Sequence, residues 1–209
     1  MPNWCNNSLT VSGPEETVAE FHAIVIRDGN CRLTNHWPTP QELVDTRAGS
    51  DPSDEEERIA FKKQQQSNFD KYGARDWYDW NINNWGTKWS DSDTELQTDN
   101  VQGQLNYVYQ TAWAPPRGLI EKMSMDYPTL TFTGDYSEDG VGFMGAFEFI
   151  AGEMTKEITG DIGDGVIALS DGQIFTFPPY DDDSPLGDDQ WEIMHQVQNT
   201  AFESMVMSL

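Results

Sequence analysis

Cysteine and histidine are the side chains most often used for nucleophilic catalysis and transition-metal binding, and this chain has few of either. Its 209 residues include two cysteines, Cys5 and Cys31, and three histidines, His22, His36 and His195. Two thiolates cannot complete a structural zinc site unaided, and neither a C-x-x-C pair nor an H-E-x-x-H pattern is present. We therefore expect free thiols, with a Cys5–Cys31 disulfide as the alternative, and no metal or other cofactor.

Carboxylate side chains are so frequent that pairs arise by chance. Paired carboxylates can act as general acid and base or hold a divalent cation. The chain has 36 acidic residues, and its closely spaced pairs include Asp76 and Asp79, Glu138 and Asp139, and Asp161 and Asp164. No P-loop, dinucleotide-binding glycine motif or G-x-S-x-G motif accompanies them. These pairs predict no particular reaction, and we assign no catalytic residue.

One acidic segment resembles the first half of a calcium-binding loop. Asp135, Ser137, Asp139 and Gly140 fall on positions 1, 3, 5 and 6 of an EF-hand pattern. The bidentate glutamate required at position 12 is replaced by Ala146, and the flanking residues are typical of strands. The segment is therefore interpreted as a hairpin turn.

The densest group of aromatic side chains lies between residues 76 and 89, where four tryptophans and a tyrosine occur within 13 residues. The rings could seal a small core over a sheet edge or helix. They could instead recognise a partner protein, because aromatic residues are enriched at binding hot spots. A stacking platform for bases is disfavoured, because the tryptophan-rich stretch contains one lysine. We predict a specific contact made by Trp77, Trp80, Trp85, Gly86, Thr87, Lys88 and Trp89.

Negative charge dominates the composition and is unevenly distributed. The formal net charge is −24, of which −8 lies in residues 1–122 and −16 in residues 123–209. Such a chain is not expected to bind nucleic acid directly, since phosphate binding needs clustered Lys and Arg. The charge could reflect saline surroundings, a nucleic-acid-like face that occupies the basic groove of a partner protein, or unremarkable acidic loops. The predicted acidic face consists of Asp181, Asp182, Asp183, Asp188 and Asp189.

The spacing of apolar and turn residues predicts an α+β fold. Residues 7–11 alternate as a strand, and apolar residues recur at helical spacing after a helix-start signal at Pro14. Further strands are expected at 94–99, 104–113, 129–133 and 143–150, with a helix opened by Pro115 and Pro116 after the second of them. This order predicts a ferredoxin-like sandwich, in which helices cover one face of an antiparallel sheet.

The same reading divides the chain into two parts. Residues 1–155 form the predicted ferredoxin-like domain, interrupted at about 45–92 by an insert that holds the tryptophan-rich segment and a charged helix. Ile59, Phe61 and Phe69 give that helix a modest apolar face. The remainder, 156–209, is an acidic C-terminal extension with a hairpin of residues 166–169 and 173–177 and a terminal helix at 191–207.

Neither a membrane span nor a secretory signal is predicted. No run of about 18 apolar residues occurs. The first seven residues lack the basic and apolar regions of a signal peptide. We expect the protein to act inside a cell, away from membranes, where its thiols stay reduced.

Five segments resemble the YubB-like family of phage and plasmid proteins. They are MPNWCNN at 1–7, P-x-P-x-E-L at 38–43, WGTKW at 85–89, TAWAPP at 111–116 and YSEDGVGFMG at 136–145. The resemblance implies a ferredoxin-like domain and an origin in a phage or mobile element, and it transfers no catalytic residue. It also suggests that Thr87, Lys88 and Glu138 converge, so Glu138 joins the predicted contact.

These observations favour an interaction protein over an enzyme. We predict an accessory protein that acts through protein–protein contact in the cytoplasm of a bacterial host. It could inhibit a nucleic-acid-handling or defence protein with a basic surface, in the manner of a DNA mimic. The alternatives are a virion-associated structural component and a metal-dependent enzyme of unknown substrate. The sequence predicts no oligomeric state.

Overall fold

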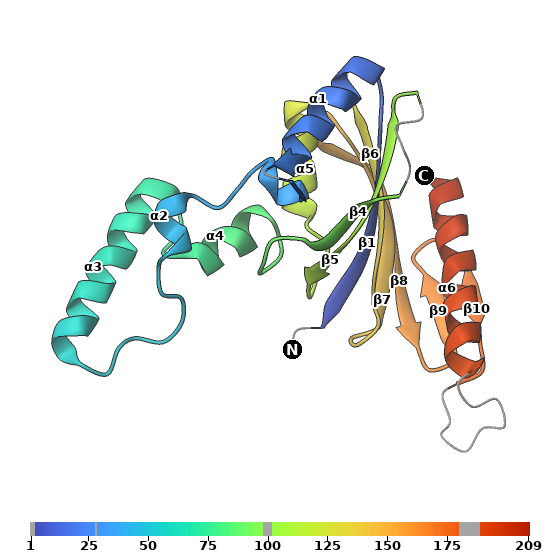
Figure 1. Ribbon diagram of the computed structural model, residues 1–209. Helices are drawn as coiled ribbons and strands as arrows, with labels where there is room; N and C mark the ends of the chain where they lie inside the picture. Colours follow the sequence, from blue (N-terminus) through green and yellow to red (C-terminus); the bar gives the residue numbers. More distant parts are fainter. Residues whose placement is uncertain (1–2, 28, 98–101, 180–188) are drawn as a thin grey trace.

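We describe the protein from a computed structural model of residues 1–209, in which every residue except 1–2, 28, 98–101 and 180–188 is placed well enough to describe (Figure 1). The described residues form an antiparallel sheet in the order β10-β9-β8-β7-β6-β1-β5-β4, and a separate hairpin of β2 and β3. The strands of the large sheet are β1 (Trp4–Ser12), β4 (Ser92–Leu96), β5 (Gln104–Ala112), β6 (Thr131–Glu138), β7 (Phe143–Ile150), β8 (Glu153–Gly163), β9 (Val166–Leu169) and β10 (Ile174–Thr176). The hairpin pairs β2 (Ile26–Arg27) with β3 (Asn30–Cys31).

Half of this sheet has ferredoxin-like topology. Helix α1 (Glu15–Val25) follows β1, and helix α5 (Arg117–Asp126) connects β5 to β6. The resulting β-α-β-β-α-β unit places its strands in the order β6-β1-β5-β4, with every neighbouring pair antiparallel. The α+β ferredoxin-like fold predicted from the sequence is confirmed.

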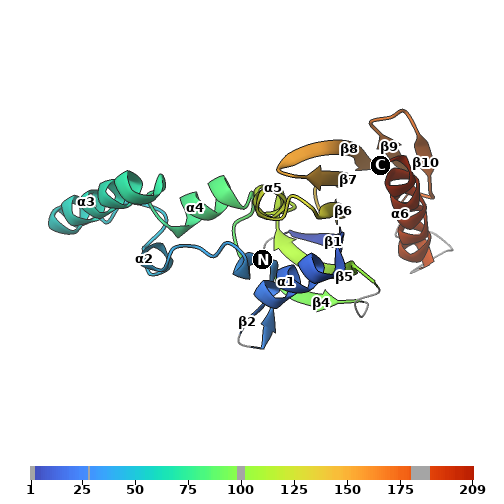
Figure 2. The same ribbon diagram turned by 90° about the horizontal axis from the view of Figure 1, so that it is seen from above.

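The main core lies between this sheet and its two helices (Figure 2). Alternate residues of β1, among them Leu9 and Val11, are buried against Phe21 of α1 and Met123 of α5. The intervening residues of β1 are polar and only partly covered. The period-two pattern of the strand and the helical spacing of α1 therefore meet at a single apolar layer.

A second, smaller core lies on the opposite face of the sheet. Met144 and Ala146 of β7 belong to it, whereas their neighbours Phe147 and Phe149 belong to the main core. Helix α6 (Asp189–Ser208) contributes Ala201 and Met205 to this layer. The C-terminal strands therefore continue the ferredoxin-like sheet, and α6 covers the face that α1 and α5 leave open (Figure 1).

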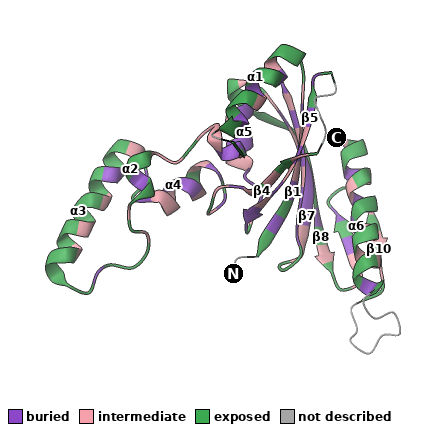
Figure 3. Ribbon diagram, in the orientation of Figure 1, coloured by how far each residue is buried: buried purple, intermediate pink, exposed green. Residues whose placement is uncertain are grey.

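Residues 41–84 form an arm that projects from the body (Figures 1 and 2). The arm consists of α2 (Gln41–Val44), α3 (Glu55–Tyr72) and α4 (Trp77–Asn84), of which α4 packs against α5. Asn68 is the buried residue of α3, and most of that helix is exposed (Figure 3). The apolar face predicted for this helix is largely exposed, since Ile59 is 61% and Phe69 53% exposed, whereas Phe61 is half-buried with the Arg47 guanidinium over its ring. Too little of the body lies near α3 to cover these side chains.

The described part of the chain contains no helix that is both long enough and apolar enough to cross a membrane.

Candidate interaction site

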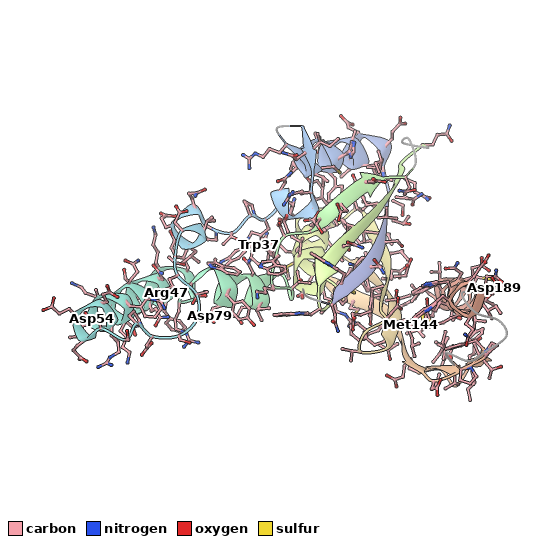
Figure 4. The ribbon with its side chains drawn as sticks, turned by 60° about the horizontal axis from the view of Figure 1, so that its bottom comes forward. Trp37, Arg47, Asp54, Asp79, Met144 and Asp189 are labelled. Atoms are coloured by element: carbon pink, nitrogen blue, oxygen red, sulfur yellow. The ribbon has the colours of Figure 1, made fainter. Side chains whose placement is uncertain are left out.

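Buried tryptophans connect the arm to the body. Trp80 of α4 packs edge-to-face on Trp37 and on Trp85, with ring centroids 5.3 and 5.5 Å apart. The indole nitrogen of Trp85 donates a hydrogen bond of 2.8 Å to the Trp37 carbonyl, at the junction of arm and body (Figure 4). Trp80 and Trp85 are both buried. Although the sequence placed them in a contact surface, their rings are covered by neighbouring residues and have a structural role.

The segment after α4 is held tightly against the end of β5. Gly86 has a φ of 85°, a left-handed conformation that glycine adopts without steric cost. The buried Thr87 hydroxyl donates to the Ala112 carbonyl at 2.8 Å, and the Asn81 amide donates to the Lys88 carbonyl at 2.9 Å. These bonds anchor Thr87 and Lys88, the two residues that follow Gly86, to β5 and to α4.

Lys88 lies among aromatic rings that come from three places in the sequence. Its Nζ atom is 4.7 Å from the ring centroid of Trp89, 5.0 Å from that of Trp113 and 5.8 Å from that of Tyr78. Trp4 lies next to Trp89, with centroids 6.3 Å apart. We call these five residues the aromatic platform. Cation–π contacts of this kind hold an ammonium group over ring faces without neutralising its charge.

The platform is accessible to solvent. Trp4 and Trp89 are each 37% exposed and Trp113 is 42% exposed. Trp113 has a φ of 72°, which is rare for a bulky residue. Its backbone N–H donates to the Asn3 carbonyl at 3.0 Å, so the two chain segments that carry Trp4 and Trp113 are tied together. Within the described ranges, Lys88 has no carboxylate within ion-pair distance.

Sequence reasoning missed Trp4, Tyr78 and Trp113 as members of this site. Tyr78 lies inside the tryptophan-rich segment, but Trp4 and Trp113 are remote from it in sequence. Both occur within segments that carried the family resemblance, MPNWCNN and TAWAPP. Their strands pair directly, with Trp4 opposite Ala112, and this pairing brings the two rings to one end of the sheet.

Among the described residues, no hydrogen bond or ion pair joins Glu138 to Thr87 or Lys88. Its buried carboxylate accepts hydrogen bonds from the backbone N–H groups of Gly140 and Val141, at 2.8 and 2.7 Å. These bonds shape the turn between β6 and β7. The part of the chain that the structure describes contains no group of three His, Cys, Asp or Glu side chains that could hold a metal ion.

A polar groove of about 570 Å³ lies between the open face of the sheet and α6. We call it the acidic groove, because none of its lining residues is Lys or Arg and four of them carry carboxylates. These four are Asp93, Glu95, Asp135 and Asp139. Ser8 donates a hydrogen bond to Asp135, and the Gln198 amide donates to Asp139 at 3.0 Å. Burial raises the pKa of the Asp135 carboxyl.

The predicted acidic face lies largely beyond what can be described. Asp181, Asp182, Asp183 and Asp188 fall outside the described residues, and Asp189 is exposed in the first turn of α6. Both cysteines are free. Burial is the main cause that raises the pKa of the Cys5 thiol to about 12, so this thiol is not a ready nucleophile.

A family model supports the fold of one part of the chain. Residues 84–174 match a family model described as a ferredoxin-like domain in Api92-like protein. The structure is similar to the crystal structure of a protein api92 from Yersinia pseudotuberculosis, with a TM-score of 0.42 and 13% sequence identity, covering 79% of this chain and 99% of that chain. No curated protein matches the chain. The matched residues run from the end of α4 to the start of β10, and the chain therefore contains a ferredoxin-like domain.

Proposed function

We propose that this chain is a protein-interaction module that contacts its partner through the aromatic platform. The observation that carries this proposal is the exposure of Trp4, Trp89 and Trp113 around a lysine with no carboxylate partner among the described residues. Tryptophan supplies a large contact area at a small cost in side-chain entropy, and it is over-represented among residues that dominate binding energy. The buried Trp80 and Trp85 and the half-buried Trp37 pack on one another at the adjoining junction of arm and body, and this packing supports the segment that carries Lys88 and Trp89.

The proposed context is a phage or mobile element in a bacterial host. The five segments that resemble the YubB-like family support this origin, and three of them carry platform residues. The partner on this proposal is a host protein that the accessory protein binds in the cytoplasm.

A second candidate function is inhibition of a nucleic-acid-handling protein with a basic surface. The acidic groove favours it, because four carboxylates line a concave surface that lacks Lys and Arg. In such a complex the groove, rather than the platform, would make the principal contact. Complementary charge would accelerate association and make it sensitive to salt.

The test is affinity capture from nuclease-treated host lysate with the tagged full-length chain. We expect Trp89→Ala combined with Trp113→Ala to abolish capture of the specific partner while the melting temperature changes little. The matched control is Trp191→Ala, which removes an exposed tryptophan from α6, away from the platform. Undiminished capture by the double variant would contradict the role of the platform.

The same experiment separates the candidate functions. Suppose that the Trp191→Ala variant and the platform variant both still capture the partner, and that added DNA displaces it at low salt. This result would favour binding through the acidic groove. Recovery of the chain in purified phage particles, read by mass spectrometry, would instead support a virion component. Binding of magnesium or manganese, measured by calorimetry, would support a metal-dependent activity.

A further inference from the structure

A pocket of about 520 Å³ opens where the arm joins the body, next to the aromatic platform, and it shares Trp89 with the platform. Its size lies within the range of small-ligand sites, about 300–1,000 Å³. The walls come from the chain between β3 and α2, from α2 and α4, and from the segment after α4. Their apolar part consists of Pro38, Val44, Trp77, Trp85 and Trp89.

The charge of this pocket is opposite to that of the chain. None of the residues that line it is Asp or Glu, although the chain has 36 acidic residues, and its charged lining residue is Arg32. The exposed Arg32 guanidinium donates one hydrogen bond of 2.7 Å, from Nη1 to the Ser90 hydroxyl. Among the described residues the Arg32 side chain has no carboxylate within ion-pair distance and no second hydrogen bond, so most of its five N–H donors are available to a ligand.

We propose that this pocket binds an aromatic carboxylate: a ligand with a flat apolar body and a single negative charge. The carboxylate would pair with the Arg32 guanidinium, whose planar array of donors suits two parallel hydrogen bonds. The aromatic body would lie against the indole rings of Trp77 and Trp89, with the offset or edge-on geometry that aromatic rings prefer.

The net charge of the molecule further restricts which ligands can bind. A net charge of −24 repels every anion, and the repulsion grows with the charge of the ligand. A monoanion is therefore favoured over a nucleoside phosphate or a strand of nucleic acid. Two sources supply this chemistry: a free aromatic acid, or the C-terminal carboxylate of a peptide that ends in an aromatic residue.

The test compares a charged probe with its neutral isostere on the wild-type protein. N-acetyl-L-phenylalanine carries the carboxylate, and N-acetyl-L-phenylalaninamide replaces it with an amide. We expect the acid to shift the indole N–H signals of Trp77, Trp85 and Trp89 in ¹H–¹⁵N spectra and to bind at least about tenfold more tightly than the amide. Equal affinities, shifts confined to tryptophans outside the pocket, or no shift at about 10 mM acid would each overturn the proposal.

Variants that remove a positive charge provide a second test. Arg32→Gln should reduce the affinity for the acid to that for the amide. The matched control is Arg27→Gln. Arg27 is an exposed arginine of β2, close to Arg32 in sequence, and it does not line the pocket. Undiminished preference for the acid in Arg32→Gln would overturn the assignment.

A last comparison distinguishes the two sources. Phenylacetate represents a free aromatic acid, and N-acetyl-L-phenylalanine represents the end of a peptide. Tighter binding of phenylacetate supports a free acid as the ligand, and tighter binding of N-acetyl-L-phenylalanine supports a peptide C-terminus.

Discussion

Trp85 and Trp89 are four positions apart in one short motif and have opposite environments. Trp85 is 3% exposed and its indole nitrogen is hydrogen-bonded to a carbonyl, whereas Trp89 is 37% exposed and lies beside Lys88. The left-handed turn at Gly86 separates the two, because it ends α4 and redirects the chain. Residue type alone therefore does not distinguish a structural tryptophan from one available to a partner.

Asp135 is a carboxyl whose titration should be visible in the stability of the fold. Burial raises its pKa in the folded state. The folded protein then binds this proton more tightly than the unfolded chain does, so the ionised carboxylate opposes folding at neutral pH. We expect Asp135→Asn to have a higher free energy of unfolding than the wild type at neutral pH. The difference should shrink as the pH falls to about 4, where the unfolded carboxyl also becomes neutral.

The measurement is urea unfolding of both proteins at neutral and acidic pH. Asp171→Asn is the control of opposite sign, because hydrogen bonds from Gln173 lower the pKa of the exposed Asp171 carboxyl. Its ionised form favours folding above the pKa of the unfolded chain, and this contribution is lost as the pH falls. A wild type that is more stable than Asp135→Asn at neutral pH would contradict the prediction for the groove.

Helix α3 depends on its ends more than on a buried face. Asn68 is its buried residue, and the Asp54 side chain accepts a hydrogen bond of 3.0 Å from the backbone N–H of Glu57 at its start. Gly73 closes the other end in a left-handed conformation. A helix with so little packing gains most of its stability from capping and from pairs of charged side chains on its own surface.

Removal of the cap should therefore act locally. We expect Asp54→Ala to weaken α3 by about 1 kcal/mol and to accelerate amide hydrogen exchange throughout the helix. Exchange in β1 and β5 and the global melting temperature should stay unchanged, because α3 contributes to the main core only the partly buried Tyr72 at its end. Lys63→Ala, which shortens an exposed side chain of the same helix, is the control. A parallel loss of protection in the sheet would show that the arm is coupled to the body.

At the scale of the whole molecule, like charge accumulates on a compact body. The net charge is −24, and residues 123–209, which contain β7 to β10 and α6, account for −16 of it. Folding brings these carboxylates closer together than they are in the extended chain. The fold must overcome this repulsion through its two apolar cores.

Salt should therefore stabilise the protein. The Debye length falls from about 10 Å at 0.1 M to about 3 Å at 1 M salt, so sodium chloride screens repulsion between surface carboxylates. We expect the free energy of unfolding to rise with salt, with the larger gain in β8 to β10 and α6. The measurement is unfolding in urea, which is uncharged, at low and at about 1 M sodium chloride. A stability that does not change or that falls with salt would contradict adaptation to saline surroundings.

Local patterns in the sequence determined the fold class and several of its elements. The period-two alternation of β1 and β5 and the helical spacing of α1 are set by neighbouring residues, and they led to a ferredoxin-like unit. The tryptophan-rich segment was visible as a site for the same reason, since it is continuous in the chain. Composition alone determined the negative charge and its concentration after residue 122.

The tertiary structure decided which side chains are available for binding. Pairing of β1 with β5 places Trp4 next to Trp89 and Trp113 next to Lys88, whereas the Glu138 carboxylate is bound by backbone N–H groups of the β6–β7 turn. The placement of α6 on the open face of the sheet created the acidic groove. These outcomes depend on contacts between residues far apart in the sequence, and solvent exposure is a property of those contacts rather than of any short segment.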